Sequence, residues 1–154
     1  MSQNQSRHLG GMNKALRRAF TRFHIALYRL SGGLLGNRVP GRSFMLLTTI
    51  GRKSGQERVT PIMYISEANN FLLIASNWGE QNQPAWWLNL QALPQARVRV
   101  GRKELAVVAR RANPEERAHL WPSIQARYGE FKRYQQQVTR EIPVVILSPV
   151  VLPQ

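Results

Sequence analysis

The sequence predicts a mainly β protein, a small barrel with helices at its periphery. Six short runs of apolar or β-branched residues lie between residues 44 and 148, and turn residues separate several of them. Helical patterns are few in this region. With 154 residues and 43% hydrophobic side chains, the chain can bury the core of one domain. Six strands with few helices favour a small barrel.

The N-terminal part, residues 1–42, is predicted to be a disordered tail, an amphipathic helix and a Gly-rich connector, followed by one barrel domain at 43–154. The helix covers residues 13–30. One of its faces carries Leu16, Phe20, Phe23, Leu27 and Leu30. The opposite face carries Lys14, Arg18, Arg22 and Arg29. The apolar face suits packing on the domain, which we favour, and it also suits an anionic membrane surface, which stays open.

The expected strands are 44–50, 58–66, 70–76, 96–101, 104–110 and 143–148. Asn69-Asn70 and Gly101-Arg102 predict turns between neighbouring strands. Pro61 falls inside the second strand. Because proline lacks the N–H that a central strand donates, Pro61 indicates a strand edge or a bulge.

Three helices are expected among these strands. The first covers 84–90, with Pro84 in its first turn. The second covers 114–128. Its start is marked by Asn113 as N-cap, Pro114 at the first helical position and Glu116 in place to close a capping box. A third helical stretch covers about 130–140.

Composition excludes several classes of function. The chain has no cysteine and no aspartate, so thiolate chemistry and disulfides are excluded. Its three histidines are far apart, which disfavours a metal hydrolase. No apolar run reaches the roughly 20 residues of a membrane span, and no signal peptide is visible, so we expect a cytoplasmic protein. The net charge of +14 favours a polyanionic partner, whether nucleic acid, anionic lipid or a small molecule.

Residues 51–58, Gly-Arg-Lys-Ser-Gly-Gln-Glu-Arg, are the most informative stretch. They connect two predicted strands, and their glycines allow backbone N–H groups to approach a ligand closely. Such a loop can form an anion-binding concavity, and arginine can grip a phosphate through two hydrogen bonds. A phosphate-binding loop and a solvated hairpin turn are equally compatible with these residues. Neither a Walker loop nor a dinucleotide fingerprint is present, because both require different glycine spacings.

Two further groups of residues could contact a ligand. Residues 75–89 combine polar side chains at a strand end with the adjacent pair Trp86 and Trp87, whose flat rings could border a ring system or simply fill the barrel end. Tyr128, Phe131 and Tyr134 stand three residues apart, as on one helical face. A tyrosine there could donate a proton, or the face could pack on the barrel.

Taken together, four blocks resemble the deazaflavin-dependent nitroreductase family: LLTTIGRKSGQERVTP, ASNWG, QPAWWLNLQALPQARVRV and RYGEFKRYQQQVTREIPVVIL. The resemblance runs from about Phe44 to Pro149. It implies a split β-barrel of the FMN- and deazaflavin-binding type and a reductase that uses coenzyme F-420, a deazaflavin with a phosphate and a polyglutamate tail. The implied reaction is hydride transfer to an electron-poor enoate, quinone or nitro compound.

The resemblance also implies roles for individual residues. Arg52, Lys53 and Ser54 would hold the phosphate and the acidic tail. The cofactor's path would be lined by Arg58, Val59, Thr60, Pro61, Ile62 and Met63, its ring met by Ala75, Ser76 and Asn77, and the whole covered by Ala85, Trp86, Trp87, Leu88 and Asn89. Tyr128, Phe131 and Tyr134 would border the substrate, with Phe131 also against the cofactor. Proton donation would fall to Tyr134, Tyr128, Ser76 or water.

The chain departs from the family pattern at Trp78, where glycine is common, and at Phe131 and Trp87, where tyrosine is common. These departures leave the substrate open. An FMN-binding reductase and a nucleic-acid-binding barrel stand as alternatives; we expect no nucleic acid, because the aromatic residues do not line a strand platform. The expected partner is a small-molecule substrate, and the protein is expected to be a monomer or homodimer. Contact of 13–30 with an anionic membrane surface, on the inner face of the cell membrane, stays open as an alternative to packing.

Overall fold

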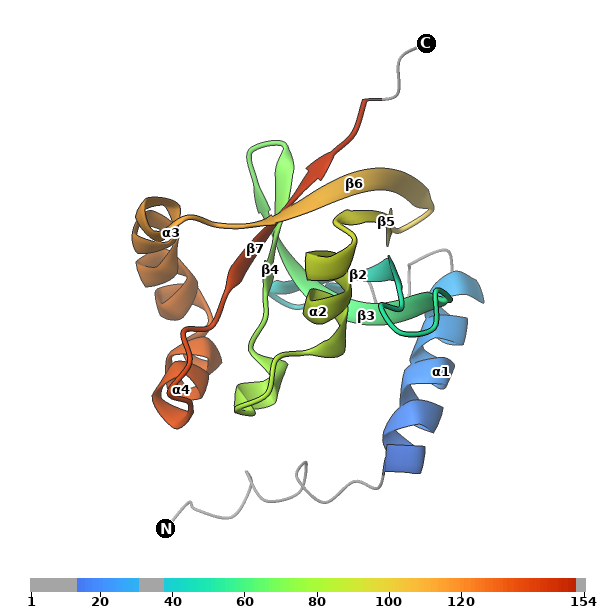
Figure 1. Cartoon of the computed structure of the whole chain (residues 1–154), viewed down its shortest axis with the longest axis horizontal. Helices are drawn as coiled ribbons and strands as arrows, with labels where there is room; N and C mark the ends of the chain where they lie inside the picture. Colours follow the sequence, from blue (N-terminus) through green and yellow to red (C-terminus); the bar gives the residue numbers. More distant parts are fainter. Residues whose placement is uncertain (1–13, 31–37, 152–154) are drawn as a thin grey trace.

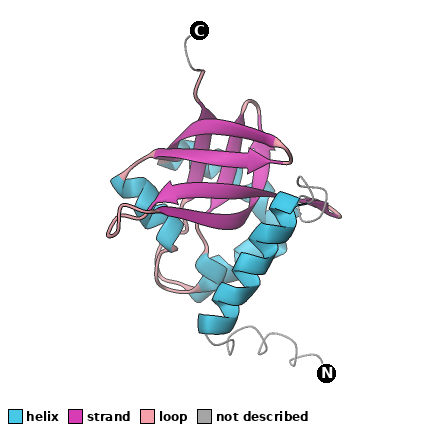
Figure 2. Ribbon diagram, turned by 90° about the vertical axis from the view of Figure 1, so that its right-hand side faces the viewer, coloured by secondary structure: helices cyan, strands magenta, loops and turns pink. Residues whose placement is uncertain are grey.

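The computed structural model describes residues 14–30 and 38–151, and it contains a closed antiparallel barrel. Six strands pair in the order β2 (Arg42–Ile50), β3 (Glu57–Glu67), β4 (Asn70–Ile74), β7 (Val144–Pro149), β6 (Lys103–Arg111) and β5 (Gln95–Val100). Pairing of β5 with β2 then closes the barrel (Figures 1 and 2). All six predicted strands are confirmed. The two-residue strand β1 (Arg38–Val39), which pairs with the start of β2, was not predicted.

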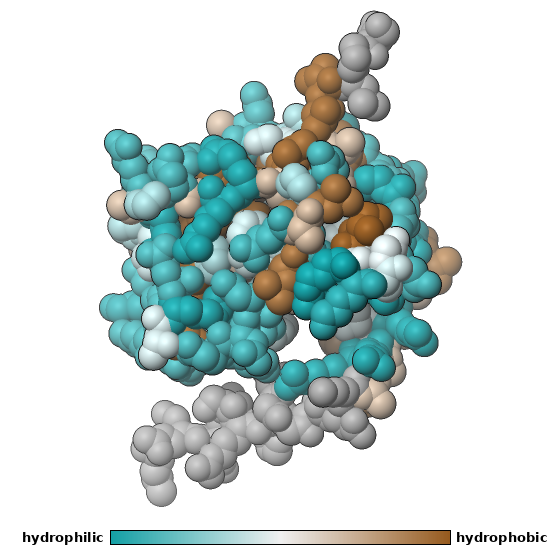
Figure 3. Space-filling view, in the orientation of Figure 1, coloured by the Kyte–Doolittle hydropathy of each residue, from teal (hydrophilic) through white to brown (hydrophobic). Residues whose placement is uncertain are grey.

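Two apolar clusters stabilise this architecture. One fills the barrel with inward-facing residues of the strands, and Trp86, Trp87 and Leu90 extend it. The other lies between β4 and β7 and two helices that cover them, α3 (Pro114–Arg127) and α4 (Gly129–Gln137). β4 and β7 lie between the two clusters, so their side chains are buried on both faces, which explains their continuous apolar sequence. Hydrophilic residues cover most of the face shown in Figure 3.

The helices depart from the predicted pattern in small ways. α2 (Ala85–Ala92) begins after Pro84, which is its N-cap and lies before the first turn. α3 and α4 are separated at Tyr128, whose backbone is not helical. A short 3-10 turn, η1 (Asn77–Gly79), follows β4 and was not predicted. The turn between β3 and β4 lies at Ala68 and Asn69, one residue earlier than expected.

Pro61 lies at a strand edge, as its sequence context predicts. It pairs with Leu46 on β2, and the pairing of β3 with β4 begins only at Ile65. The other side of β3 therefore has no strand neighbour at Pro61, where a missing N–H costs nothing. The β2–β3 register is continuous, so there is no bulge at this position.

Helix α1 (Lys14–Leu30) lies along the outside of the barrel, on the opposite side from α3 and α4 (Figures 1 and 2). Tyr28 anchors it and is fully buried. Its hydroxyl accepts a hydrogen bond from the Gly101 N–H at 2.8 Å and donates to the carbonyl of Arg99 at 3.1 Å. Burial raises the pKa of this phenol, which keeps the donor proton in place.

The prediction that the apolar face of α1 packs on the domain is wrong. Leu16, Phe20, Phe23, Leu27 and Leu30 are 37–87% exposed. The helix instead turns Tyr28, with the half-buried His24 and Ile25, towards the barrel. The buried Tyr28 and its two hydrogen bonds determine which face of the helix contacts the barrel. The spacing of the apolar residues predicts an apolar face but does not say which surface will cover that face.

Helix α3 begins with the predicted capping box. The Asn113 side chain accepts from the Glu116 N–H at 2.8 Å, and the Glu116 carboxylate accepts from the Asn113 N–H at 3.1 Å. Glu116 also pairs with Arg110 at 2.7 Å. These hydrogen bonds, first that of Arg110 and then that of Asn113, lower the pKa of Glu116 to about 2.

This shift predicts a pH dependence of stability. In the unfolded chain Glu116 titrates near an ordinary glutamate pKa, so its stabilising contribution is complete above about pH 5 and disappears as the pH falls towards 2. We expect Glu116→Gln to reduce the slope of unfolding free energy against pH in this window, measured by urea unfolding. Glu115→Gln, on the same turn without these partners, is the control and should leave the slope unchanged.

Candidate functional site

The β2–β3 loop is a tight turn that glycine permits at two positions. The Gly51 N–H donates to the carbonyl of Gln56 at 2.7 Å, and the Gly55 N–H donates to the carbonyl of Gly51 at 2.8 Å. A Cβ on Gly51 would lie 2.7 Å from the Ser54 Oγ and 3.3 Å from the carbonyl oxygen of Gln56, so a larger residue would displace the Ser54 side chain. Gly55 has a φ of 70°, in the left-handed region that favours glycine. The loop is therefore a defined structure and not an open hairpin end.

Asn89 of α2 fixes this loop from the side. Its side-chain oxygen accepts from the backbone N–H of Arg52 at 3.1 Å and from the Arg52 guanidinium at 3.2 Å. Its NH2 group donates to the Thr49 Oγ1 at 3.2 Å. Asn89 and Thr49 are buried. Because a buried amide is costly unless it is hydrogen-bonded, these three contacts lock the orientation of Asn89 and hence of Arg52.

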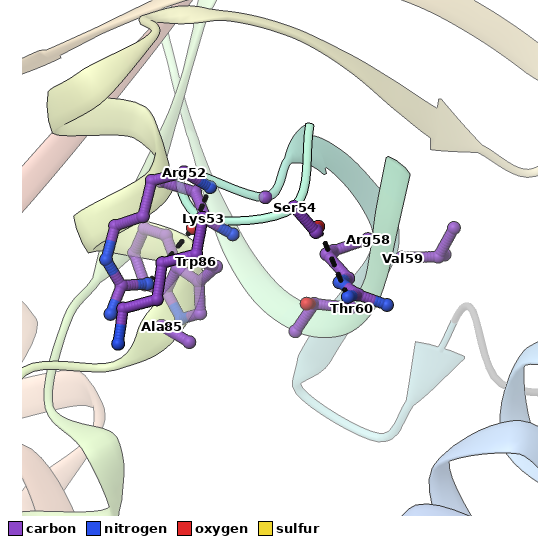
Figure 4. A pocket seen from close by; sticks show the side chains of 10 residues that line it. Arg52, Lys53, Ser54, Arg58, Val59, Thr60, Ala85 and Trp86 are labelled. Atoms are coloured by element: carbon purple, nitrogen blue, oxygen red, sulfur yellow. Dashed lines mark hydrogen bonds between the residues drawn. The ribbon is translucent and has the colours of Figure 1, made fainter. Parts of the chain in front are cut away.

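An open cavity of about 380 Å³ lies between the loop, β3 and the start of α2. Its lining residues are Gly51, Arg52, Lys53, Ser54, Arg58, Val59, Thr60, Ala85, Trp86 and Asn89. Figure 4 shows Arg52, Lys53 and Trp86 on the α2 side and Arg58 with Thr60 on the β3 side. The Arg58 guanidinium donates to the Ser54 Oγ at 3.3 Å, which ties the loop to β3.

The cavity is strongly cationic. Among the described residues, no carboxylate pairs with Arg52, Lys53 or Arg58. Glu57, the acid nearest to them in sequence, is held by Arg97 of β5 at 2.6 Å. Three unneutralised cations around one concavity attract an anion with several charges. The residues therefore fit a phosphate with an acidic tail.

A second element of the site is the loop from Ala75 to Pro84. It starts at the buried end of β4, where Ala75 and Ser76 lie, and it ends next to Ala85 at the cavity. Arg140, from the segment between α4 and β7, holds it. The Arg140 guanidinium donates to the carbonyls of Ala75, Ser76 and Glu80 at 3.1–3.2 Å. Burial lowers the pKa of Arg140.

Sequence reasoning missed Arg140 and Thr49. Both act through contacts with residues more than 35 positions away, and no local motif marks them. The sequence pattern put Arg140 at the end of the expected helix at about 130–140, but α4 ends at Gln137, so nothing in the sequence marked Arg140 as a loop residue. Thr49 lies in a strand pattern that any β-branched residue would satisfy.

The three aromatic residues form a row, as predicted, but not on one helix. Tyr128 lies at the break between α3 and α4, and the ring centroids of Tyr128, Phe131 and Tyr134 follow one another at 6.2 Å in edge-to-face arrangement. Tyr128 is buried, and its hydroxyl donates to the carbonyl of Gly41 at 3.2 Å. Tyr134 is half-buried, and its hydroxyl has no hydrogen-bond partner among the described residues.

The structure places the predicted site residues in five locations. The cavity contains Arg52, Lys53, Ser54, Arg58, Val59, Thr60, Ala85, Trp86 and Asn89. Pro61, Ile62 and Met63 continue along β3, and Ala75, Ser76 and Asn77 lie at the end of β4. Trp87 is 4% exposed in the barrel core, and Leu88 is half-buried beside it. Phe131 and the two tyrosines belong to the cluster under α3 and α4.

A cluster of metal ligands and a membrane-spanning helix are both absent from residues 14–30 and 38–151. No group of three metal-ligating side chains occurs in these ranges. Nor is any helix there long and apolar enough to cross a membrane.

Known proteins resemble this chain in sequence and fold. The family model described as F420H(2)-dependent quinone reductase matches residues 20–149. An F420H(2)-dependent quinone reductase of Mycobacterium tuberculosis is 35% identical over 131 residues, which is 82% of this chain and 88% of the relative. The solved structure of an F420-H2-dependent reductase, FDR-A, superposes with a TM-score of 0.62 at 36% identity, covering 68% of this chain and 93% of that one.

Another solved structure, described as a domain-swapped dimer, has a TM-score of 0.64 at 32% identity and covers 82% of this chain and 94% of its own. The family match at residues 20–149 spans the whole barrel. It confirms the predicted split-barrel class and the deazaflavin cofactor, and the FMN alternative is not needed. The chain therefore belongs to the F420H(2)-dependent quinone reductase family and is an oxidoreductase that uses reduced coenzyme F-420.

Proposed function

We propose that the cationic cavity holds the phosphate and acidic tail of coenzyme F-420, with Arg52, Lys53, Ser54 and Arg58 as the binding residues. This proposal is supported by the absence of any carboxylate partner for Arg52, Lys53 and Arg58 among the described residues. The nearest acid in sequence, Glu57, is ion-paired with Arg97 instead. Asn89 orients Arg52, and the backbone N–H groups of the loop add neutral donors.

The remaining contacts in this proposal are those that the family resemblance implies. Val59 to Met63 line the cofactor along β3, and Ala85, Trp86 and Asn89 of α2, which line the cavity, close over it. Trp87 supports them from the barrel core. Ala75, Ser76 and Asn77 meet the ring, and Phe131 lies behind it. When bound, reduced F-420 supplies a hydride from its central ring carbon to the acceptor. The chain's own residues bind and orient, exclude water and supply a proton.

We propose a quinone as the acceptor and Tyr134 as the proton donor. Tyr128 is the weaker candidate, because its hydroxyl proton is already donated to the carbonyl of Gly41. Ser76 is 8% exposed, and no hydrogen bond of its hydroxyl is found among the described residues, so it can serve as an alternative donor. Tyr134 lies against the Gly79 backbone, so it borders the same loop as Ser76 and Asn77.

A parallel binding titration tests this assignment. F-420, FMN and single-stranded DNA are titrated into the purified chain at low and high salt. We expect tight, salt-sensitive binding of F-420 and much weaker binding of FMN, because FMN carries a phosphate without the acidic tail. FMN binding as tight as that of F-420 would contradict the proposed role of the cavity, and tight DNA binding would favour the nucleic-acid alternative.

We also propose that α1 lies on an anionic membrane surface. The protein would then be cytoplasmic and peripherally attached to the membrane through this helix. Its exposed apolar stripe, Leu16, Phe20, Phe23, Leu27 and Leu30, has no other cover among the described residues, and Arg18, Arg22 and Arg29 on the same helix are exposed cations. An amphipathic helix with this composition inserts its apolar side chains at the headgroup boundary. A second copy of the chain, in a homodimer, is the competing cover.

Vesicle co-sedimentation distinguishes these covers. We expect the double variant Phe20→Ser/Phe23→Ser to lose at least tenfold in affinity for anionic vesicles, because two large side chains no longer enter the interface. Val108→Ser, an exposed apolar position on β6, is the control. Unchanged vesicle binding in the double variant would contradict the proposal. A wild-type chain that is a dimer without vesicles, together with a double variant that is a monomer, would also contradict it, because the stripe would then be covered by a second copy.

A further inference from the structure

The loop that follows β4 has a strained backbone at its tip. Asn77, Trp78 and Gly79 have φ values of 48°, 59° and 77°, three consecutive residues in the left-handed region. Glycine adopts this conformation freely and asparagine tolerates it, but a tryptophan there is unfavourable. Such outliers persist only where the surrounding structure holds them, and they gather at functional sites.

Arg140 is the residue that holds this tip. Its guanidinium contacts the carbonyls of Ala75, Ser76 and Glu80, and more weakly that of Asn82, and it donates to the side-chain oxygen of Gln83 at 3.2 Å. These acceptors lie before and after the tip, so one side chain fixes both ends of it. No carboxylate pairs with Arg140 in the described part of the chain.

A second pair of contacts reinforces the same arrangement. The Gln81 side chain donates to the Thr139 Oγ1 at 2.6 Å and accepts from the Thr139 N–H at 3.1 Å. The Asn77 side chain donates to the carbonyl of Asn82 at 2.9 Å and so closes the loop on itself. The tip is therefore braced from the α4–β7 segment at two neighbouring residues.

What this brace presents to solvent is the ring of Trp78. Trp78 is 74% exposed, whereas Trp86, Trp87 and Trp121 are at most 8% exposed. Its ring makes no aromatic or cation contact with any described residue. A strained backbone that exposes a large flat apolar surface gains nothing for the fold, which points to a ligand as its partner.

The backbone that carries this ring lies next to the proposed substrate side of the site. The following residue, Gly79, packs so closely on α4 that a Cβ there would lie 2.8 Å from Tyr134 Cδ1 and 2.4 Å from the Gln137 Oε1. The preceding residues Ser76 and Asn77 are those proposed to meet the deazaflavin ring. In the chain, Trp78 thus stands between the residues proposed to meet the deazaflavin ring and the glycine that packs on the proposed proton donor.

From these observations we infer that Trp78 is the stacking surface for the acceptor, and that it gives the enzyme a preference for planar fused-ring quinones over single-ring quinones. Arg140 is the positioning residue that keeps the indole in place. This inference rests on the proposed function, because it assigns the acceptor to the side of the site bounded by Tyr134.

The test compares two acceptors matched in reduction potential, a benzoquinone and a fused-ring naphthoquinone, with reduced F-420 as donor. Trp78→Asn keeps a residue that accepts the left-handed backbone and removes the ring. It should raise KM for the naphthoquinone by about 3- to 10-fold, the range typical of one aromatic stacking contact, and change KM for the benzoquinone by less than twofold. Trp78→Phe should lie between Trp78→Asn and wild type.

Arg140→Lys tests the brace. A lysine ammonium cannot reach acceptors on both ends of the tip, so this variant should lose the same preference although Trp78 is present. Val108→Ala, an exposed apolar position on β6, is the control and should retain it. Equal KM changes for both acceptors in Trp78→Asn, or a lower Tm in Trp78→Asn than in wild type, would overturn the inference, since the second result would show that the indole stabilises the fold. An unchanged preference in Arg140→Lys would overturn the positioning role.

A readout without turnover separates this inference from the proposed function. Acrylamide quenches exposed tryptophans, so the quenchable fluorescence of this chain should come mainly from Trp78 and disappear in Trp78→Asn. A redox-inert naphthalene analogue should protect the wild-type fluorescence from quenching. Protection without any quinone turnover would overturn the proposed function alone, and turnover without protection would overturn the stacking role alone.

Discussion

Tyr134→Phe should lower turnover by about 100- to 10,000-fold with acceptors whose reduced form is a strongly basic anion, because it removes one general acid. The ring of Tyr134 remains in place, since it packs edge-to-face on Phe131 with ring centroids 6.2 Å apart. The affinity for F-420 should therefore barely change. Steady-state kinetics with an enoate, a nitro compound and a quinone, together with an F-420 titration, measure both quantities.

Quinones should suffer least from this substitution, because a reduced quinone leaves as a comparatively stable anion and needs less help from an acid. Tyr128→Phe is the matched control. Its hydroxyl donates to the carbonyl of Gly41, so we expect a loss of stability and little loss of turnover. If turnover with every acceptor survived in both variants, the phenols would be packing residues and the proton would come from elsewhere, most simply from water.

Lys53→Ala and Arg58→Ala should each weaken F-420 binding by about 1.5–3 kcal/mol, the value of a hydrogen bond to a charged group. This corresponds to a rise in Kd of roughly 10- to 150-fold. A truncated analogue without the phosphate and the glutamates should bind both variants as it binds wild type, because its ring contacts the other half of the site. Fluorescence titration with the two ligands gives both affinities.

A charge-matched control separates a local contact from the net positive charge of the chain. Arg102 is an exposed cation in the turn between β5 and β6, far along the barrel from the cavity. Arg102→Ala removes one charge as Lys53→Ala does, and it should leave F-420 affinity nearly unchanged at moderate salt, because exposed charges beyond about 8–10 Å are screened. Equal losses with Arg102→Ala, or equal losses for the full and truncated ligands, would show that the loop does not hold the tail.

Much of this arrangement could be predicted from local sequence. The strand patterns located all six barrel strands, and Asn113, Pro114 and Glu116 located the start of α3, because caps and turns depend on residues next to one another in the chain. The loop at 51–58 was recognisable because its glycines and cations are contiguous, and the cavity is built around it.

The partners of these elements could not be predicted in the same way. The spacing of Leu16, Phe20 and Phe23 correctly indicated a helix, but it could not show that Tyr28 would be the residue that docks it. Likewise, Tyr128 and Tyr134 have equivalent positions in the sequence pattern, and only the carbonyl of Gly41 makes them different. Hydrogen bonds between distant segments depend on where the backbone brings a donor and an acceptor together.

The sequence by itself determined the barrel strands, the basic glycine loop and the deazaflavin family, since each of these depends on residue types at short spacings. Tertiary structure alone decided that Glu57 leaves the cavity to pair with Arg97, that Asn89 orients Arg52, and that Arg140 braces the tip at Trp78. The physical reason is that these ion pairs and hydrogen bonds depend on three-dimensional distances between residues that are far apart in the sequence. Whether a cation is free to bind a ligand is therefore known only when its neighbours from other strands are in place.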